Sequence, residues 1–162
     1  SQADPETPWR LRVRGHRPDE SGWMSGREAE RGYYARQFSR CERVPLSDAV
    51  AFDPHGPDMT AWYERVGVAL SVSDFESFHF TLPDAALAGA VPLALAWPGA
   101  DLIYPRHWLA ADVDQLTALI REATATEDVR RERAADAAAF VREHLADPVV
   151  LPRLADAVLG TR

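Results

Sequence analysis

Two carboxylates are the strongest candidates for chemistry, because of their type and their spacing. Glu76 and Asp84 lie eight residues apart, across the junction between an apolar run and an expected helix. Helical backbone rises about 1.5 Å per residue and would separate them by about 12 Å, roughly the length from a sugar ring to the ribose of a nucleotide sugar. Carboxylates accept hydrogen bonds from the paired hydroxyl groups at both ends of such a molecule. Free N–H groups at the start of the helix would face its diphosphate, so the junction predicts a nucleotide-sugar site.

The elements that must position these residues follow the pattern of an α/β protein with a parallel sheet. Strands are expected over residues 9–14, 49–52, 67–72, 91–97 and 102–104. Helices are expected over 27–43 and 58–66, up to about Gly89, from Asp112, over 127–145 and up to 159. Ligands of parallel sheets bind at the carboxyl ends of the strands. This rule selects four loops, at 15–18, 53–56, 73–79 and 97–101, as the place for chemistry.

A resemblance to a known family becomes specific in the segment 73–92. The segment contains Ser73, Glu76-Ser77-Phe78-His79, Asp84, Gly89 and Val91-Pro92-Leu93. It resembles the C-terminal half of retaining GT-B glycosyltransferases of the large "group 1" family. In that family a strand and a Ser precede E-G-F-G, a helix with the second acid of an E-x7-E motif, a Gly and a Pro-Val strand. The order of the expected elements agrees with the family over residues 9–159.

The resemblance implies the fold class, the domain and the roles of individual residues. The fold would be α/β, with a Rossmann-like parallel sheet and flanking helices, in a single domain over 9–162 after a flexible leader at 1–8. Glu76 would be the catalytic residue and bind hydroxyls of the donor sugar, and Asp84 would bind the nucleotide ribose. Backbone N–H groups of Ser77, Phe78 and His79 would face the diphosphate or the sugar, and Gly15 and Gly56 would lie near the nucleotide. By its place in one of the four loops, Arg17 is a candidate for binding an anion.

By this resemblance the chain binds a nucleoside-diphosphate sugar for transfer to an acceptor hydroxyl, with retention of the anomeric configuration. No metal and no further cofactor are expected, since positioning and stabilisation of the leaving diphosphate would supply the catalysis. The acceptor-binding N-terminal domain of the family would be a missing partner. The isolated chain is therefore expected to be inactive or nearly so.

The sequence departs from the family pattern in three places. The second acid is Asp84 and not Glu, and Ser77 and His79 replace both glycines of E-G-F-G. No G-R…K segment, which clamps the phosphates in the family, precedes Trp9. Either the chain is a piece of a longer protein, or its sheet is completed differently. Completion by another copy of the chain would mean self-association.

Other interpretations stay open. The chain could be a non-catalytic nucleotide-sugar-binding or regulatory domain, or one half of a related nucleotide-sugar epimerase. Asp84 could close a T-x-x-D capping box with Thr81, and Glu76 could be a solvated loop acid.

Composition excludes several classes of function. The 162 residues suffice for one domain with a core, and 25 acids against 18 Arg, with no Lys, give a net charge of −7. An acidic chain is a poor general binder of nucleic acid, and the lack of Lys excludes Schiff-base chemistry. The single Cys41 excludes an intrachain disulfide and a multi-Cys zinc site. No apolar stretch is long enough for an integral membrane segment, so we expect a cytoplasmic protein, with a peripheral place at the inner face of the membrane left open.

Overall fold

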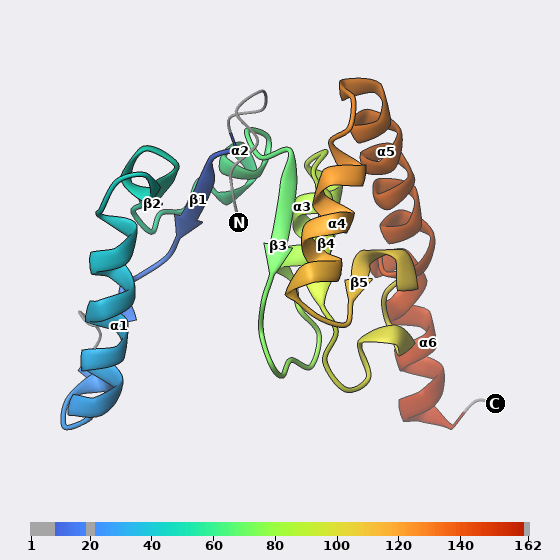
Figure 1. Ribbon diagram of the computed structural model, residues 1–162. Helices are drawn as coiled ribbons and strands as arrows, with labels where there is room; N and C mark the ends of the chain where they lie inside the picture. Colours follow the sequence, from blue (N-terminus) through green and yellow to red (C-terminus); the bar gives the residue numbers. More distant parts are fainter. Residues whose placement is uncertain (1–8, 19–21, 161–162) are drawn as a thin grey trace. The chain divides into compact units, whose positions relative to one another are not determined.

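The chain divides at Pro57 into two compact units, which a computed structural model describes over residues 9–18 and 22–160, with only the backbone of Trp23. Unit 1 is Ser1–Pro57 and unit 2 is Asp58–Arg162, and each has its own parallel sheet (Figure 1). The expected α/β class, with small parallel sheets flanked by helices, is confirmed. A single domain over 9–162 stays a prediction, and the expected leader at 1–8 lies outside the described residues.

Unit 1 is built on two short strands and one long helix. Strand β1 (Leu11–Arg14) pairs in parallel with strand β2 (Val50–Asp53). Between them in the chain come helix α1 (Glu28–Cys41) and two 3-10 turns, Gly22–Met24 and Leu46–Asp48. These positions confirm the strands expected over 9–14 and 49–52 and the helix expected over 27–43.

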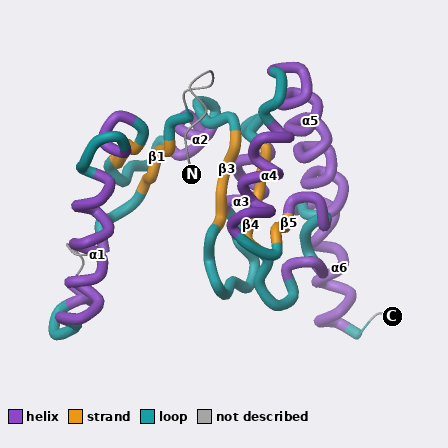
Figure 2. The backbone as a smooth tube through the Cα atoms, viewed as in Figure 1, coloured by secondary structure: helices purple, strands orange, loops and turns teal. Residues whose placement is uncertain are grey.

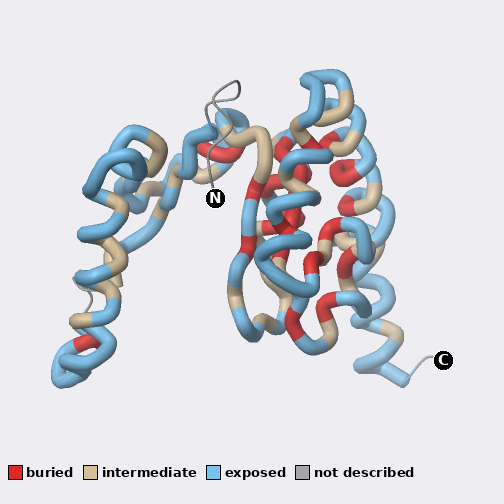
Figure 3. The backbone as a smooth tube through the Cα atoms, viewed as in Figure 1, coloured by how far each residue is buried: buried red, intermediate tan, exposed pale blue. Residues whose placement is uncertain are grey.

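Few of the described side chains of unit 1 are buried. Residues of β1 alternate between exposed and half-buried, and α1 has no buried residue. Among the side chains described in unit 1, that of Met24 alone is buried, and Figure 3 accordingly shows little red in this unit. An ion pair joins the two strands: Arg12 donates from Nε and Nη2 to the two carboxylate oxygens of Asp53, at 2.8 and 2.7 Å.

Unit 2 contains a three-stranded parallel sheet in the order β3-β4-β5 (Figure 2). Its strands are β3 (Val68–Ser71), β4 (Val91–Leu95) and β5 (Leu109–Ala110). The central strand β4 is a continuous apolar run and its first four residues are buried. Such a run is typical of a parallel strand that is covered on both faces.

Helices cover both faces of β4. Successive side chains of a strand point to opposite sides, so residues of β4 contact helices on each face. Val91 and Leu93 pack in one cluster with Leu116 of helix α4 (Val113–Ala123). On the other side, Ala94 packs in a second cluster with Leu82 of helix α3 (Thr81–Leu87). Helix α5 (Glu127–His144) packs along α3 and adds Ala137 and Val141 to the second cluster. Helices α2 (Met59–Tyr63) and α6 (Asp147–Leu159) complete unit 2.

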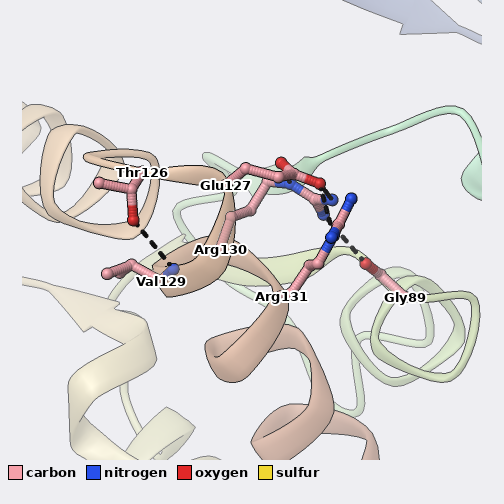
Figure 4. Close-up of polar contacts among 6 residues, drawn as sticks. All are labelled: Gly89, Thr126, Glu127, Val129, Arg130 and Arg131. Atoms are coloured by element: carbon pink, nitrogen blue, oxygen red, sulfur yellow. Dashed lines mark hydrogen bonds and ion pairs between the residues drawn. The ribbon is translucent and has the colours of Figure 1, made fainter.

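Capping side chains fix the starts of two helices of unit 2. The Asp112 carboxylate accepts a hydrogen bond from the Gln115 N–H at 2.8 Å and so caps α4, the helix expected from Asp112. At α5 the Thr126 hydroxyl accepts from the Val129 N–H at 3.2 Å (Figure 4). Each cap satisfies an N–H group that the first helical turn leaves without a backbone partner.

An ion pair follows the cap of α5. Arg130 donates from Nε and Nη2 to the two carboxylate oxygens of Glu127, at 2.8 and 2.7 Å, and Arg131 donates to one of them at 2.8 Å (Figure 4). The hydrogen bond from Arg130 is the main reason that the pKa of Glu127 falls to about 2. Arg130 also donates from Nη1 to the Gly89 carbonyl at 3.5 Å, which ties α5 to the turn between α3 and β4.

One expected strand is wrong. Residues 102–104 do not form a strand, and the edge of the sheet is β5 at Leu109–Ala110. After β4, Gly99 adopts a φ of +90°, a conformation that favours glycine, and a 3-10 turn follows over Ala100–Leu102. Tyr104 is then buried in the cluster around Leu82, so packing of its ring decides the local structure.

Candidate functional site

The predicted residues of unit 2 lie mainly in the loop between β3 and α3. Strand β3 ends at Ser71 and α3 begins at Thr81, so Glu76, Ser77, Phe78 and His79 follow the carboxyl end of the strand. Ser77 is exposed, and the other three are half-buried. The Glu76 side chain is 31% exposed, so its carboxylate is reachable from solvent.

Glu76 and His79 form the central contact of this loop. Oε1 of the Glu76 carboxylate lies 3.3 Å from Nδ1 of His79. The His79 ring meets the buried ring of Trp97 edge to face, with 6.0 Å between the centroids. Because Trp97 follows β4, this contact brings the predicted loops 73–79 and 97–101 together, as the parallel-sheet rule predicts.

Tyr104 also contacts the loop between β3 and α3. Its hydroxyl donates a hydrogen bond to the His79 carbonyl at 3.2 Å, and its ring contacts those of Phe78, Trp97 and Trp108. Burial raises the pKa of Tyr104 to about 12, and the nearby charge of Asp84 adds to this shift. The hydroxyl therefore stays protonated at neutral pH and remains a donor.

Asp84 lies in α3. It lines a small hollow of about 310 Å³ with Tyr63, Glu64 and Leu87. Desolvation raises the pKa of Asp84 above its ordinary value. The capping-box alternative is not observed, since the cap residue of α3 is Phe80 and makes no side-chain capping hydrogen bond.

The helix between the two acids begins after the predicted loop 73–79. α3 starts five residues after Glu76, so the N–H groups of Ser77, Phe78 and His79 belong to the loop and not to a first helical turn. Within that turn, the N–H of Leu82 donates to the His79 carbonyl at 3.1 Å, and Pro83 has no N–H. Binding of a diphosphate at this junction stays a prediction, in which the amides of 77–79 would act as loop amides.

The other three predicted residues belong to unit 1. Gly15 follows β1 with a φ of +149°, a conformation that favours glycine, whereas Gly56 follows β2 without a positive φ. The Arg17 guanidinium lies over the Phe38 ring, 4.1 Å from its centroid, and 3.8 Å from the Glu42 carboxylate. Gly15 and Arg17 line one cavity of about 770 Å³, together with Asp53, Pro54 and His55.

Each unit therefore brings its own two predicted loops together. In unit 1 the rings of His16 and His55 stack, with 4.6 Å between their centroids, and in unit 2 the ring of His79 meets that of Trp97. Within each unit, the two strand-end loops that the parallel-sheet rule selects are thus in contact. A single cleft that contains all four loops stays a prediction.

Several residues of these sites were not identified from the sequence. Tyr104 was expected in a strand, and its role depends on a contact with His79, 25 residues away. His16 and His55 gave no signal, because their spacing fits no motif and only folding stacks them. Tyr34 and Phe38 had a usable signal, since their spacing places them on one face of α1, and both line the cavity of unit 1.

Two further properties bear on function. The described part of the chain contains no group of three or more His, Cys, Asp or Glu side chains placed to hold a metal ion. None of the helices over 9–18 and 22–160 has both the length and the apolar character needed to cross a membrane.

Comparison of the chain with models of protein families, with curated proteins and with solved structures found no significant match. Membership of the glycosyltransferase family that segment 73–92 resembles thus stays a prediction.

Proposed function

We propose that this chain is the donor-binding part of a retaining glycosyltransferase. It would bind a nucleoside-diphosphate sugar and present it to an acceptor hydroxyl, with the acceptor held by a further domain. The observation that carries the proposal is the place of Glu76: a solvent-reachable carboxylate at the carboxyl end of a parallel strand, in a loop that touches the next strand-end loop. Ligands of parallel α/β sheets bind at this edge.

Glu76 has the chemistry for a sugar. Its contact with His79 engages one carboxylate oxygen, Oε1, and a carboxylate has two oxygens that can each accept hydrogen bonds. Under the proposal, Glu76 accepts from neighbouring hydroxyls of the donor sugar. His79 acts as a positioning residue, because it contacts the carboxylate on one side and the buried Trp97 on the other.

Asp84 would bind the ribose. Its charge lies near Tyr104, whose hydroxyl donates to the His79 carbonyl. A ribose diol would donate to the Asp84 carboxylate at the hollow beside Tyr63.

The reaction follows from these roles. The bond between the anomeric carbon and the diphosphate breaks, the acceptor oxygen bonds to that carbon on the same face, and the hydroxyl proton leaves with the diphosphate. Positioning of the donor and stabilisation of the leaving diphosphate would lower the barrier. Loop amides at 77–79 are the groups of unit 2 offered for the diphosphate under the proposal.

The test is calorimetric titration of the full chain with UDP-sugars and GDP-sugars. Glu76→Gln keeps the shape of the side chain and removes its charge, and we expect it to weaken binding about tenfold, the size of a lost charge-assisted hydrogen bond. Asp84→Asn should weaken binding by a similar factor. Asp74→Asn, an exposed acid in the same loop, is the matched control and should leave affinity unchanged. No binding of any nucleotide sugar, or equal binding by the Glu76→Gln and Asp74→Asn variants, would contradict the proposal.

A further inference from the structure

Unit 1 contains a cavity that the proposed function does not explain. It has a volume of about 770 Å³ and lies at the carboxyl ends of the parallel strands β1 and β2, beside α1. Small-molecule sites in proteins usually have volumes of about 300–1,000 Å³ and are found at this edge of parallel sheets. All of its described lining residues belong to unit 1, so the inference rests on this unit alone.

The cavity wall is aromatic. Tyr33, Tyr34 and Phe38 come from α1, and Phe52 comes from β2. The rings meet edge to face: Tyr33 with Tyr34 at 5.5 Å between centroids, and Phe38 with Phe52 at 5.2 Å. Tyr33 is 53% exposed and Phe52 is 37% exposed, so part of the surface of each residue remains accessible to solvent. A flat aromatic ligand would cover this surface by stacking or by edge-to-face contact.

The charge of the cavity favours an anion. Arg14 and Arg17 both line it, whereas Asp53 is the one carboxylate among its described lining residues. Asp53 is already bound by Arg12 through two hydrogen bonds, at 2.8 and 2.7 Å. The central carbon of the Arg17 guanidinium lies 4.1 Å from the Phe38 ring centroid, and one guanidinium nitrogen lies 3.8 Å from the Glu42 carboxylate. A guanidinium edge is a good donor to a phosphate or a carboxylate.

The stacked His16 and His55 rings lie in the same wall. They come from the loops after β1 and β2, so the contact between them joins the two loops that form one side of the cavity. An anion would be approached there by imidazole nitrogens as well as by Arg17.

We propose that this cavity is a binding site for a small aromatic anion. The aromatic ring would lie against Tyr34, Phe38 and Phe52, and the anionic group would accept hydrogen bonds from Arg17. The site is separate from the residues of unit 2 that carry the proposed function. The test of this site therefore does not depend on those residues of unit 2.

The experiment titrates the full chain with four probes and follows binding by calorimetry and by NMR shifts of the histidine ring protons. Phenyl phosphate and benzoate carry a ring and a charge, cyclohexyl phosphate has the charge without the aromatic ring, and benzyl alcohol has the ring without the charge. We expect at least one of the two aromatic anions to bind about tenfold more tightly than cyclohexyl phosphate and benzyl alcohol, and to shift the His16 and His55 signals. Preference for phenyl phosphate or for benzoate tells a phosphate ligand from a carboxylate ligand.

Two variants and one control locate the site. Arg17→Gln and Tyr34→Leu should each weaken binding of the aromatic anion by about tenfold, because one removes the charged donor and the other the aromatic face. Arg10→Gln, an exposed arginine of unit 1 that does not line the cavity, should leave affinity unchanged. Far-UV circular dichroism shows whether each variant is folded, and two different variants keep the test valid if one of them unfolds.

The outcomes separate this inference from the proposed function. Equal affinity for phenyl phosphate, benzoate and cyclohexyl phosphate, or the same loss in the Arg10→Gln variant as in Arg17→Gln, would overturn the aromatic-anion site. Binding of an aromatic anion with no binding of nucleotide sugars would support this site and contradict the proposed function. Nucleotide-sugar binding that depends on Glu76, without binding of the small aromatic anions, would do the reverse.

Discussion

Both units contain parallel strands, but the burial of their side chains differs strongly. In each, parallel strands deliver two loops to one edge, where the loops meet through a pair of rings. In unit 2 that meeting point rests on buried residues, since Trp97 is 4% exposed and Leu82 beneath it is fully buried. In unit 1, of the side chains that the structure describes, Met24 alone is buried, and the loops surround a cavity. Topology thus places the loops, whereas the core decides how firmly they are held.

The sequences of the strands explain the difference. Strand β4 reads VPLAL and offers apolar groups to both faces, so helices α3 and α4 can cover it. Strand β1 reads LRVR and alternates apolar residues with arginine, so one face consists of half-buried guanidinium groups. Burial of apolar surface contributes most of the stability of a domain, and unit 2 has far more of it.

The largest expected effect tests this difference with the same substitution in each unit. Leu93→Ala removes a side chain that is 1% exposed at the centre of β4 and should lower the free energy of unfolding by about 2–5 kcal/mol. Leu11→Ala, in β1, removes one that is 48% exposed and should cost about 1 kcal/mol or less. Urea unfolding followed by circular dichroism measures both. Equal losses would show that unit 1 has as firm a core as unit 2.

Sequence patterns predicted the elements of both units well and their contacts poorly. Periodicity located α1, β3 and β4, and the parallel-sheet rule selected the four strand-end loops, which the structure shows meeting in pairs within each unit. The edge-to-face contact of Phe78 and Phe80 in the loop before α3 is a tertiary contact that helical periodicity does not reveal. The contact between Glu76 and His79 was not predicted either, since the family that the segment resembles has glycine at the position of His79. The cavity of unit 1 depends on how α1 packs against loops distant in the chain, which spacing alone cannot predict.

A smaller effect tests how firmly the loop of unit 2 is held. Tyr104→Phe removes the hydrogen bond to the His79 carbonyl and should cost about 1 kcal/mol of unfolding free energy. Because the pKa of Tyr104 rises to about 12 from the ordinary 10, the native state disfavours its ionisation. The ionisation of Tyr104 should therefore cause no change of stability with pH below pH 10. Above pH 10 the free energy of unfolding should fall as the pH rises towards 12.

Two measurements check this prediction for Tyr104. Spectrophotometric titration should show one tyrosine that ionises near pH 12 in the wild type and not in the Tyr104→Phe variant. Urea unfolding should give the loss at neutral pH. An unchanged late titration step in the variant would mean that another tyrosine is responsible, and would break the argument that the His79 loop rests on Tyr104.

The smallest effects compare the two bidentate ion pairs, one in each unit. Glu127→Gln breaks the pair with Arg130 on exposed α5, and Asp53→Asn breaks the pair with Arg12 that joins β1 and β2. We expect Asp53→Asn to shift the amide exchange of its own unit more, because unit 1 has so little buried surface to replace the pair. The effect of Glu127→Gln should depend on pH. The folded-state pKa of Glu127 is about 2, below its ordinary value of 4.5, so the pair stabilises the fold above pH 4.5 and loses its effect as the pH falls towards 2.

Hydrogen exchange and urea unfolding, at neutral pH and midway between those two pKa values, measure both substitutions. For Glu127→Gln, the difference from the wild type should be full at neutral pH and smaller at the acidic pH, because protonation of Glu127 removes the ion pair from the wild type as well. A pH-independent difference would mean that the carboxamide disturbs the cap of α5 rather than the ion pair. If Asp53→Asn leaves exchange in β1 and β2 unchanged, then apolar contacts and not the ion pair hold unit 1 together, and the contrast between the units is one of degree only.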